Sequence, residues 1–354
     1  MGFRRILAIK LREVGDVVIW TSALQNLRSL SPEATIDVLV REQVEPVLRG
    51  QPWIDRVHTV QSRRPLHLAR RLIALRAENY DLALGFYATN TLCRLIPLVG
   101  ARQRVLYHHK HASTPRFSTF KLPDPGRLEN AILRDHQVVR ALGLESEPTR
   151  PKLELSTVER SRARESLLPH FPDLGKEGFK LLGLLPGGSR ETKRYPKDLW
   201  LRLLERMADT QPHVRAAVFV DSELSVEWGL RAICEARGIP LFDDLDLREL
   251  IGLLSWTDVI VCNDSGPKHI AVALGARSLT LFGPTEVGEW HPYDQRIHPV
   301  VREDVPCRDL GPQDNEPFRY CTVPRCDHLS CLRQIDPDAV WTRARELLAS
   351  LDKP

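Results

Sequence analysis

The chain has 354 residues, more than one compact domain usually holds, so its length predicts two domains. Hydrophobic residues make up 42% and charged residues 27%, which excludes collagen-like, low-complexity and largely disordered classes. The net charge of +4 is small, and the longest apolar runs fall well short of the roughly 20 residues that a membrane-spanning helix needs.

Short runs rich in Val, Ile and Leu alternate with amphipathic stretches along the chain. This pattern predicts βαβ units with parallel sheets, and therefore an α/β fold. Strands are expected at residues 6–10, 36–40, 82–86 and 105–107 in the first half, and at 181–185, 216–220, 259–262 and 279–282 in the second. The first run stops at Lys10, which is too soon for the apolar core of a signal sequence, so we expect a buried strand there.

A proline-rich stretch at residues 146–180 predicts the domain boundary, because it carries Pro148, Pro151, Pro169 and Pro172. We expect an N-terminal domain at residues 1–160 and a C-terminal domain at 161–336. Residues 337–354 are predicted to form an amphipathic helix that packs back on the N-terminal domain. Its apolar stripe consists of Val340, Trp341, Ala344, Leu347 and Leu348.

The first candidate site residue is Asp16, which follows Gly15 directly after the first expected strand. In doubly wound folds the carboxyl ends of the strands border the ligand crevice, so Asp16 is expected at its mouth. The structural alternative is a helix N-cap, a position that Asp favours.

A second motif, residues 186–196, follows the strand expected at 181–185 and combines Gly187, Gly188, Ser189 and Lys193. Glycines, hydroxyls and cations together suit a phosphate group, because free backbone amides and ammonium groups neutralise its oxygens. An ordinary polar turn with solvated charges is the alternative.

The third motif, residues 258–275, reads as a buried strand, a tight polar turn and a helix with Pro267 at its start. Asp264, Ser265 and Gly266 form the turn, and the exposed amides of the helix start suit a diphosphate. His269 lies one turn into the helix, where it is either a ligand residue or a structural histidine.

These motifs, in this order and spacing, resemble glycosyltransferase family 9, the ADP-heptose:lipopolysaccharide heptosyltransferases. The resemblance covers nearly the whole chain and includes Tyr195-Pro196 and the Leu-Phe-Gly-Pro-Thr of residues 281–285. It implies the glycosyltransferase-B architecture, in which two Rossmann-like domains face a central cleft. The first domain would bind the acceptor and the second the nucleotide-sugar donor, and transfer would invert the anomeric centre without a metal.

The resemblance also implies residue roles. Asp16 would be the general base and Lys193 would stabilise the departing diphosphate. Ser189, Ser265 and Gly266 would hold phosphate oxygens, and Asp264 and His269 would complete the donor site. Lys268 and Ser265 depart from the commonest residues at their positions, and the acid that would bind the ribose stays open between Glu223 and Glu227.

An anionic glycolipid is the acceptor that the resemblance implies, and a basic stretch fits it. Residues 82–123 contain no Asp or Glu but carry Arg94, Arg102, Arg104, Lys110, Arg116, Lys121, His108, His109 and His111. Upstream, further charge comes from Arg63, Arg64, Arg70 and Arg71. Peripheral contact with the inner membrane surface follows as a prediction, with a solvated basic face as the alternative. Nucleic acid is not an expected partner, because stacking aromatics are few.

Seven cysteines, an odd number, favour a reducing compartment and hence the cytoplasm. Four of them cluster near the carboxyl end, at Cys307, Cys321, Cys326 and Cys331. Their spacing matches no common zinc ribbon, so a structural Zn or Fe and packed reduced thiols are both open readings. No cofactor is expected to be required for transfer.

The predicted function is therefore transfer of a heptose from ADP-heptose to an acidic sugar of the lipopolysaccharide inner core. Alternatives are a transferase of the same fold with another nucleotide sugar or a protein acceptor, an epimerase on the same frame, and a non-catalytic nucleotide-sugar binding protein.

Overall fold

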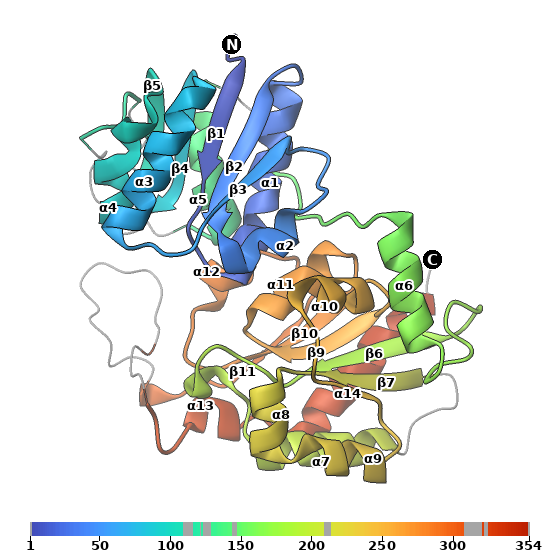
Figure 1. Ribbon diagram of the computed structural model, residues 1–354. Coiled ribbons are helices and arrows are strands. Elements are labelled where there is room, and N and C mark those ends of the chain that lie inside the picture. Colours follow the sequence, from blue (N-terminus) through green and yellow to red (C-terminus); the bar gives the residue numbers. More distant parts are fainter. Residues whose placement is uncertain are drawn as a thin grey trace. The chain divides into compact units, whose positions relative to one another are not determined.

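The computed structural model describes residues 2–108, 116–120, 122, 129–143, 147–208, 214–307, 321 and 325–352. The chain divides into two compact units, Met1–Glu154 and Leu155–Pro354. Each unit has one parallel sheet with helices on its faces (Figure 1), which confirms the predicted α/β class with two Rossmann-like domains. No helix in the described part of the chain is both long and apolar enough to cross a membrane.

The first unit is built on a five-stranded sheet in the order β3-β2-β1-β4-β5. Its strands are β1 (Arg5–Ile9), β2 (Thr35–Arg41), β3 (Arg56–Val60), β4 (Leu82–Ala88) and β5 (Gln103–His108). Its helices are α1 (Val14–Leu30), α2 (Glu45–Leu48), α3 (Pro65–Leu75), α4 (Asn90–Leu95) and α5 (Ala131–Arg140). Helices α1 and α5 pack together, while α3 and α4 pack with each other and share a core with β1 and β5.

The second unit has a six-stranded sheet in the order β11-β10-β9-β6-β7-β8. Its strands are β6 (Lys180–Leu185), β7 (Val214–Phe219), β8 (Leu241–Phe242), β9 (Val259–Asn263), β10 (Arg277–Phe282) and β11 (Val300–Arg302). Its helices are α6 (Thr157–Leu167), α7 (Lys197–Ala208), α8 (Ser222–Trp228), α9 (Leu230–Ala236), α10 (Leu247–Leu254), α11 (Gly266–Ala273), α12 (Val287–Trp290), α13 (Ser330–Arg333) and α14 (Pro337–Ala349).

Each of the eight expected strands has a counterpart in the structure, and the sequence patterns missed β3, β8 and β11. All three of these lie at an edge of their sheet. An edge strand needs less apolar surface than a central one, and β8 and β11 have only two and three residues, so no apolar run marks them.

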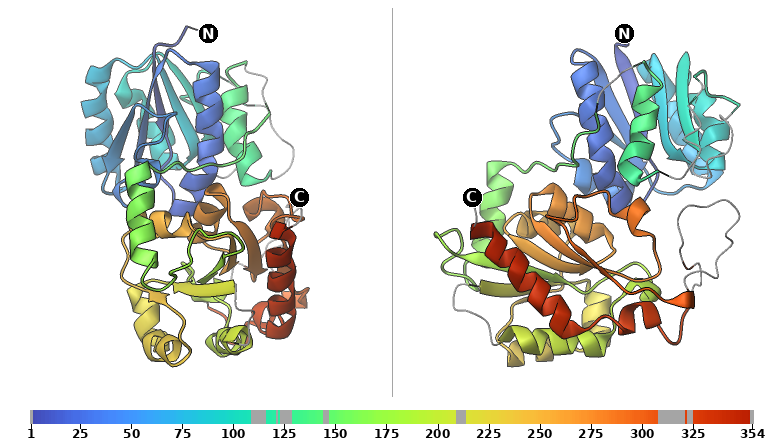
Figure 2. Two further views of the ribbon diagram at one scale, coloured as in Figure 1. Left: turned by 90° about the vertical axis from the view of Figure 1, so that its right-hand side faces the viewer. Right: turned by 180° about the vertical axis from the view of Figure 1, so that it is seen from behind.

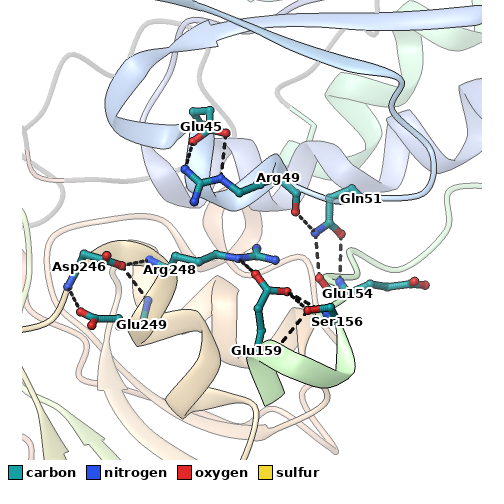
Figure 3. A network of polar contacts seen from close by, with 9 residues as sticks. All are labelled: Glu45, Arg49, Gln51, Glu154, Ser156, Glu159, Asp246, Arg248 and Glu249. Carbon is teal, nitrogen blue, oxygen red and sulfur yellow. Dashed lines mark hydrogen bonds and ion pairs between the residues drawn. The ribbon is translucent and has the colours of Figure 1, made fainter. Parts of the chain in front are cut away.

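The chain passes from one unit to the other at Leu155, between two hydrogen-bonded anchors (Figure 3). On one side, the buried Gln51 side chain accepts from Glu154 N at 2.9 Å and donates to Glu154 O at 3.0 Å. On the other, Ser156 caps α6 in a capping box with Glu159. Glu159 also accepts from Arg248 Nε at 2.7 Å, and this contact lowers the pKa of Glu159 to about 2. The division therefore falls before the expected boundary at 160, because α6 is anchored to the second unit.

Helix α14 lies across the second sheet beside α7 (Figure 2). All members of its predicted stripe, from Val340 to Leu348, are buried in a core with Leu182, Val261 and Leu281. The expectation that this helix packs back on the N-terminal domain is wrong, because its apolar face is already covered by the second sheet and α7.

Replacing Trp341 with Ala is expected to destabilise the second unit by about 3–5 kcal/mol, the cost of removing a buried aromatic side chain. Hydrogen exchange should rise in α7, β9 and β10 and stay unchanged in β1 and β4. The outer-face substitution Arg343→Ala, on the same helix, is the control. Increased exchange in β1 or β4 would show that α14 supports the first unit instead.

Candidate functional site

In each sheet the predicted site residues follow the two strands at which the strand order reverses. In the second unit these neighbours are β6 and β9, and in the first they are β1 and β4. Loops at the carboxyl ends of such a strand pair diverge to opposite faces of the sheet and leave a crevice, the usual ligand position of doubly wound folds. Asp16 in the first unit, after β1, and the predicted residues of the second unit, after β6 and β9, therefore lie where this topology favours a ligand.

Asn263, the last residue of β9, joins the loops of the second unit. It is fully buried, and its Nδ2 donates to Pro186 O at 2.7 Å and to Gly187 O at 3.1 Å. Its Oδ1 accepts from Tyr195 N at 3.0 Å. One amide side chain thus fixes the start and the end of the loop that carries Ser189 and Lys193. The sequence signal for this residue was its place directly before the turn, but its role as a loop anchor was not predicted.

Asp264 is the centre of a buried ionic cluster. Its Oδ2 accepts from Lys193 Nζ at 2.9 Å and from Thr285 Oγ1 at 2.7 Å, and its Oδ1 accepts from Lys268 Nζ at 2.7 Å. Burial by itself raises the pKa of Asp264, but the ammonium groups of Lys268 and Lys193 outweigh that effect and hold the pKa below its ordinary value. Asp264 is therefore a carboxylate, and it positions Lys193 and Lys268.

Lys268 has no exposed surface and is held by three contacts. Besides Asp264, its Nζ donates to Trp290 O at 3.0 Å and lies 4.8 Å from the centre of the Phe282 ring. Lys193, whose side chain is 15% exposed, is the cation of the pair that solvent reaches. Two ammonium groups around one carboxylate leave an excess positive charge next to the loop, which suits an anionic ligand.

Ser265 and Gly266 form the start of α11. Ser265 is the N-cap residue but makes no side-chain capping bond, and its buried Oγ has no hydrogen-bond partner among the described residues. Since a buried polar group without a partner is costly, this hydroxyl and the amides of the first turn are suited to a ligand's oxygens. The predicted Ser189 lies exposed in the other loop, whose backbone is held by a bond from Arg194 Nε to Gly188 O at 2.9 Å.

His269 is buried in an aromatic cluster with Tyr293, and its Nδ1 lies 2.6 Å from the Tyr293 hydroxyl. Burial and the nearby Lys268 ammonium group lower the pKa of His269 well below its ordinary value. The ring is therefore neutral near pH 7 and cannot supply a positive charge to a phosphate. Its remaining nitrogen can still donate or accept a hydrogen bond.

Asp16, in the first unit, lies in the first turn of α1 but is not its N-cap. The cap residue is Glu13, which makes no side-chain capping bond, so the capping alternative for Asp16 is excluded. Asp16 is 9% exposed, its Oδ1 has no hydrogen-bond partner among the described residues, and Arg12 Nε lies 3.9 Å from that oxygen. A carboxylate held at a helix start without a bonding partner on one oxygen is available to accept a proton.

Next to Asp16, Lys10 and Asp135 form a fully buried ion pair that sequence reasoning missed. Burial lowers the pKa of Lys10, which the charges of Asp135 and Asp16 oppose, and burial raises the pKa of Asp135, which Lys10 opposes. Lys10 follows β1, and Asp135 lies on α5, so only tertiary packing brings them together. Nothing in their local sequence marks the pair.

Tyr87 is a second missed residue of the first unit. It lies near the end of β4, beside a register shift against β5, and its φ of 49° is in the left-handed region that a tyrosine rarely adopts. The Arg12 and Arg134 guanidinium groups lie 4.5 and 3.8 Å from the centre of its ring. The strained backbone thus orients a ring that holds Arg12 next to Asp16.

Neither candidate for the ribose acid is buried in the structure. Glu223 and Glu227 are both exposed on α8, and Glu227 lies 3.7 Å from Arg194. Asp221, two residues after the end of β7, caps α8 by accepting from Leu224 N at 2.9 Å, and its Oδ2 lies beside Gly187, 3.5 Å from where a Cβ on that glycine would be.

The structure describes part of the basic stretch and all four cysteines of the C-terminal cluster. His109, Lys110, His111 and Lys121 lie outside the described residues, whereas Arg94, Arg102, Arg104, Arg116 and His108 are described. Cys307, Cys321 and Cys326 are partly exposed and Cys331 is buried. In the described ranges no three His, Cys, Asp or Glu side chains group as metal ligands. The metal at these cysteines stays a prediction, since residues 308–320 and 322–324 are not described.

Known proteins resemble this chain over most of its length. A family model described as "Glycosyltransferase family 9 (heptosyltransferase)" matches residues 68–315. Lipopolysaccharide heptosyltransferase 1 of Campylobacter coli is 23% identical, with 94% of this chain and 99% of the relative covered. Solved structures of a family 9 glycosyl transferase from Veillonella parvula and of ADP-heptose lps heptosyltransferase II from E. coli superpose with TM-scores of 0.80 and 0.72. Each is 19% identical to this chain, and each alignment covers 98% of it. The alignments cover 98% of the Veillonella parvula chain and 99% of the E. coli chain. At this identity the structures establish the fold.

The stability of the second unit is expected to fall between pH 7 and pH 5. Burial and the Lys268 charge lower the pKa of His291 to about 3, whereas an unfolded histidine takes up a proton near pH 6.5, so acid favours the unfolded state. Removing this group by His291→Gln should reduce the slope of unfolding free energy against pH by up to roughly 1.4 kcal/mol per pH unit. Urea denaturation across this range measures the slope, with His67→Gln as the exposed control. Identical slopes for His291→Gln and wild type would contradict the lowered pKa of His291 in the folded protein.

Proposed function

Because this chain belongs to glycosyltransferase family 9, a family of enzymes that transfer sugars, we propose that it moves a heptose from ADP-heptose to an acidic sugar of the lipopolysaccharide inner core. The relatives named as lipopolysaccharide heptosyltransferases support this donor and acceptor class. The observation that carries the proposal is the pair of lysines, Lys193 and Lys268, that shares the buried carboxylate of Asp264.

In the proposed reaction the second unit binds the donor. The diphosphate lies against the α11 start, with the Ser265 hydroxyl and the Gly266 amide as donors, Ser189 reaching it from the other loop, and His269 as a neutral partner. When the bond between the anomeric carbon and the diphosphate oxygen breaks, negative charge grows on ADP. Lys193 meets that charge, and such a preorganised cation needs no metal to do so.

Asp16 is the proposed general base of the first unit. It takes the proton from the acceptor hydroxyl while the hydroxyl oxygen attacks the anomeric carbon opposite the leaving ADP, so the anomeric centre inverts. The proton then passes from Asp16 to solvent. Arg12 and the buried Lys10–Asp135 pair are the charged groups beside the Asp16 carboxylate, and we propose that they position it.

The acceptor that we propose is an anionic glycolipid, which the arginines of the first unit suit, and the compartment is the cytoplasm. The odd number of cysteines, seven, supports a reducing compartment.

Replacing Asp16 with Asn is expected to reduce turnover by about a hundredfold to ten-thousandfold, since the amide cannot accept the proton. Binding of ADP should change less than about twofold, because Asp16 does not belong to the donor unit. The matched control is Glu13→Gln at the start of the same helix, which should keep full turnover. Turnover of Asp16→Asn within a few fold of wild type would remove its role as base and favour a binding protein.

Calorimetry of ADP, UDP and GDP in the presence of EDTA tests the donor proposal. We expect ADP to bind in preference to the other two. Lys193→Ala should lower turnover with ADP-heptose by roughly 10²–10³-fold, the scale of losing one preorganised charge partner, while exposed Lys197→Ala changes nothing. Preference for UDP or GDP would replace the sugar donor, and dependence of binding on a metal would overturn the metal-independent mechanism.

A further inference from the structure

Helix α3 exposes two large apolar side chains on the face opposite its buried one. Leu68, Leu72 and Leu75 are buried in the core of the first unit, whereas Leu66 and Ile73 are 59% and 55% exposed. Leu66 and Ile73 are seven residues apart, which is close to two helical turns, so their side chains lie on the same side of the helix. Exposed leucine and isoleucine side chains aligned in this way indicate a binding surface more strongly than scattered ones.

Arginines surround this apolar pair. Arg63 precedes the helix, Arg64 is its N-cap residue, and Arg70 lies one turn after Leu66; all three are exposed. No Asp or Glu occurs from residue 56 to residue 77, while this stretch contains six arginines. Of these arginines, Arg63 lies 3.6 Å from Glu13, the N-cap residue of α1, and Arg56 is paired with Glu78. The surface around Leu66 and Ile73 is therefore basic.

We propose that this outer face of α3, formed by Leu66, Arg70, Ile73 and Arg63, docks on the headgroup region of an anionic phospholipid bilayer. A helix with apolar side chains on its outer side and arginines around them lies in the plane of a membrane surface, with the apolar groups entering the acyl boundary. Each arginine close to an anionic surface strengthens binding by about fivefold. The positive charge disfavours a cationic partner and matches acidic headgroups.

This docking deepens the proposed function, since it rests on an acceptor that is carried by lipid. Apolar insertion without a membrane-spanning helix gives weak, reversible binding, and attraction to anionic lipid adds to it. An enzyme bound in this way can take an acceptor from the membrane surface and still exchange ADP with solution. The α3 face shares no residue with the proposed catalytic and donor-binding set, so docking and catalysis can be tested with different variants.

Flotation of the full chain with vesicles provides the test. Wild type should float with vesicles of 30% phosphatidylglycerol in phosphatidylethanolamine, and should float little with phosphatidylcholine vesicles or in high salt. The double variant Leu66→Ser/Ile73→Ser and the single variant Arg70→Glu should each lose about tenfold or more of this binding. The matched control is Val158→Ser/Val226→Ser, which changes two apolar side chains that are 57% and 82% exposed on helices of the second unit.

Two further measurements separate failure of docking from failure of the proposed function. ADP binding, and transfer to a delipidated acceptor sugar, should be unchanged in the α3 variants, while transfer to the same acceptor in vesicles should fall with flotation. Wild type that transfers heptose but does not float would overturn docking and leave the enzyme assignment intact. If both α3 variants still float with the vesicles, docking lies on another surface. If analytical ultracentrifugation shows a dimer that Leu66→Ser/Ile73→Ser abolishes, the partner of this face is a second copy of the chain. Either result overturns the proposal.

Discussion

The candidate donor site depends on one buried carboxylate, that of Asp264. A carboxylate taken out of water is stable only if cations and hydrogen-bond donors surround it, and here Lys193, Lys268 and Thr285 do so. Removing one partner of such a pair typically costs about 3–5 kcal/mol, so the carboxylate fixes the position of both lysines. Asn263 adds a second constraint, because its amide holds the loop of Lys193 against the end of β9. Lys193 is therefore held in position before any ligand binds. Electrostatic stabilisation of a leaving group requires such preorganisation.

The first unit also positions a charged side chain, that of Asp16, but through other contacts. In the described part of the chain, Asp16 Oδ1 at the start of α1 accepts no hydrogen bond, and Arg12 Nε lies 3.9 Å away. The buried Lys10–Asp135 pair and Tyr87, whose ring lies against Arg12 and Arg134, surround this carboxylate. The left-handed backbone of Tyr87 stores strain of a kind that persists only where the surrounding packing enforces it. In both units the residue with a proposed role, Asp16 or Lys193, follows a central strand at the reversal of strand order, where the topology of doubly wound sheets favours a ligand.

The connection between the units is short and defined on both sides. Gln51 holds the backbone of Glu154 in the first unit, and the Ser156 capping box and the Glu159–Arg248 contact begin the second, which leaves Leu155 as the residue between the anchors. A connection of this kind confines any change of backbone angles to a few residues, as hinges do. The α3 face lies within the first unit alone and is independent of this connection.

The sequence by itself determined the α/β class, the eight apolar strands and the order of the three polar motifs, because parallel strands and glycine-rich turns leave local signals of composition and spacing. Those signals also identified Asp16, Lys193, Ser265 and Asp264 as residues that follow strands. Which charged side chains contact one another was decided by the tertiary structure alone. The Lys10–Asp135 pair joins residues from β1's end and α5, Thr285 reaches Asp264 from beyond β10, and Gln51 anchors Glu154. It also decided that α14 packs on the second unit, since an amphipathic stripe specifies that a face must be buried but carries no information about which sheet covers it.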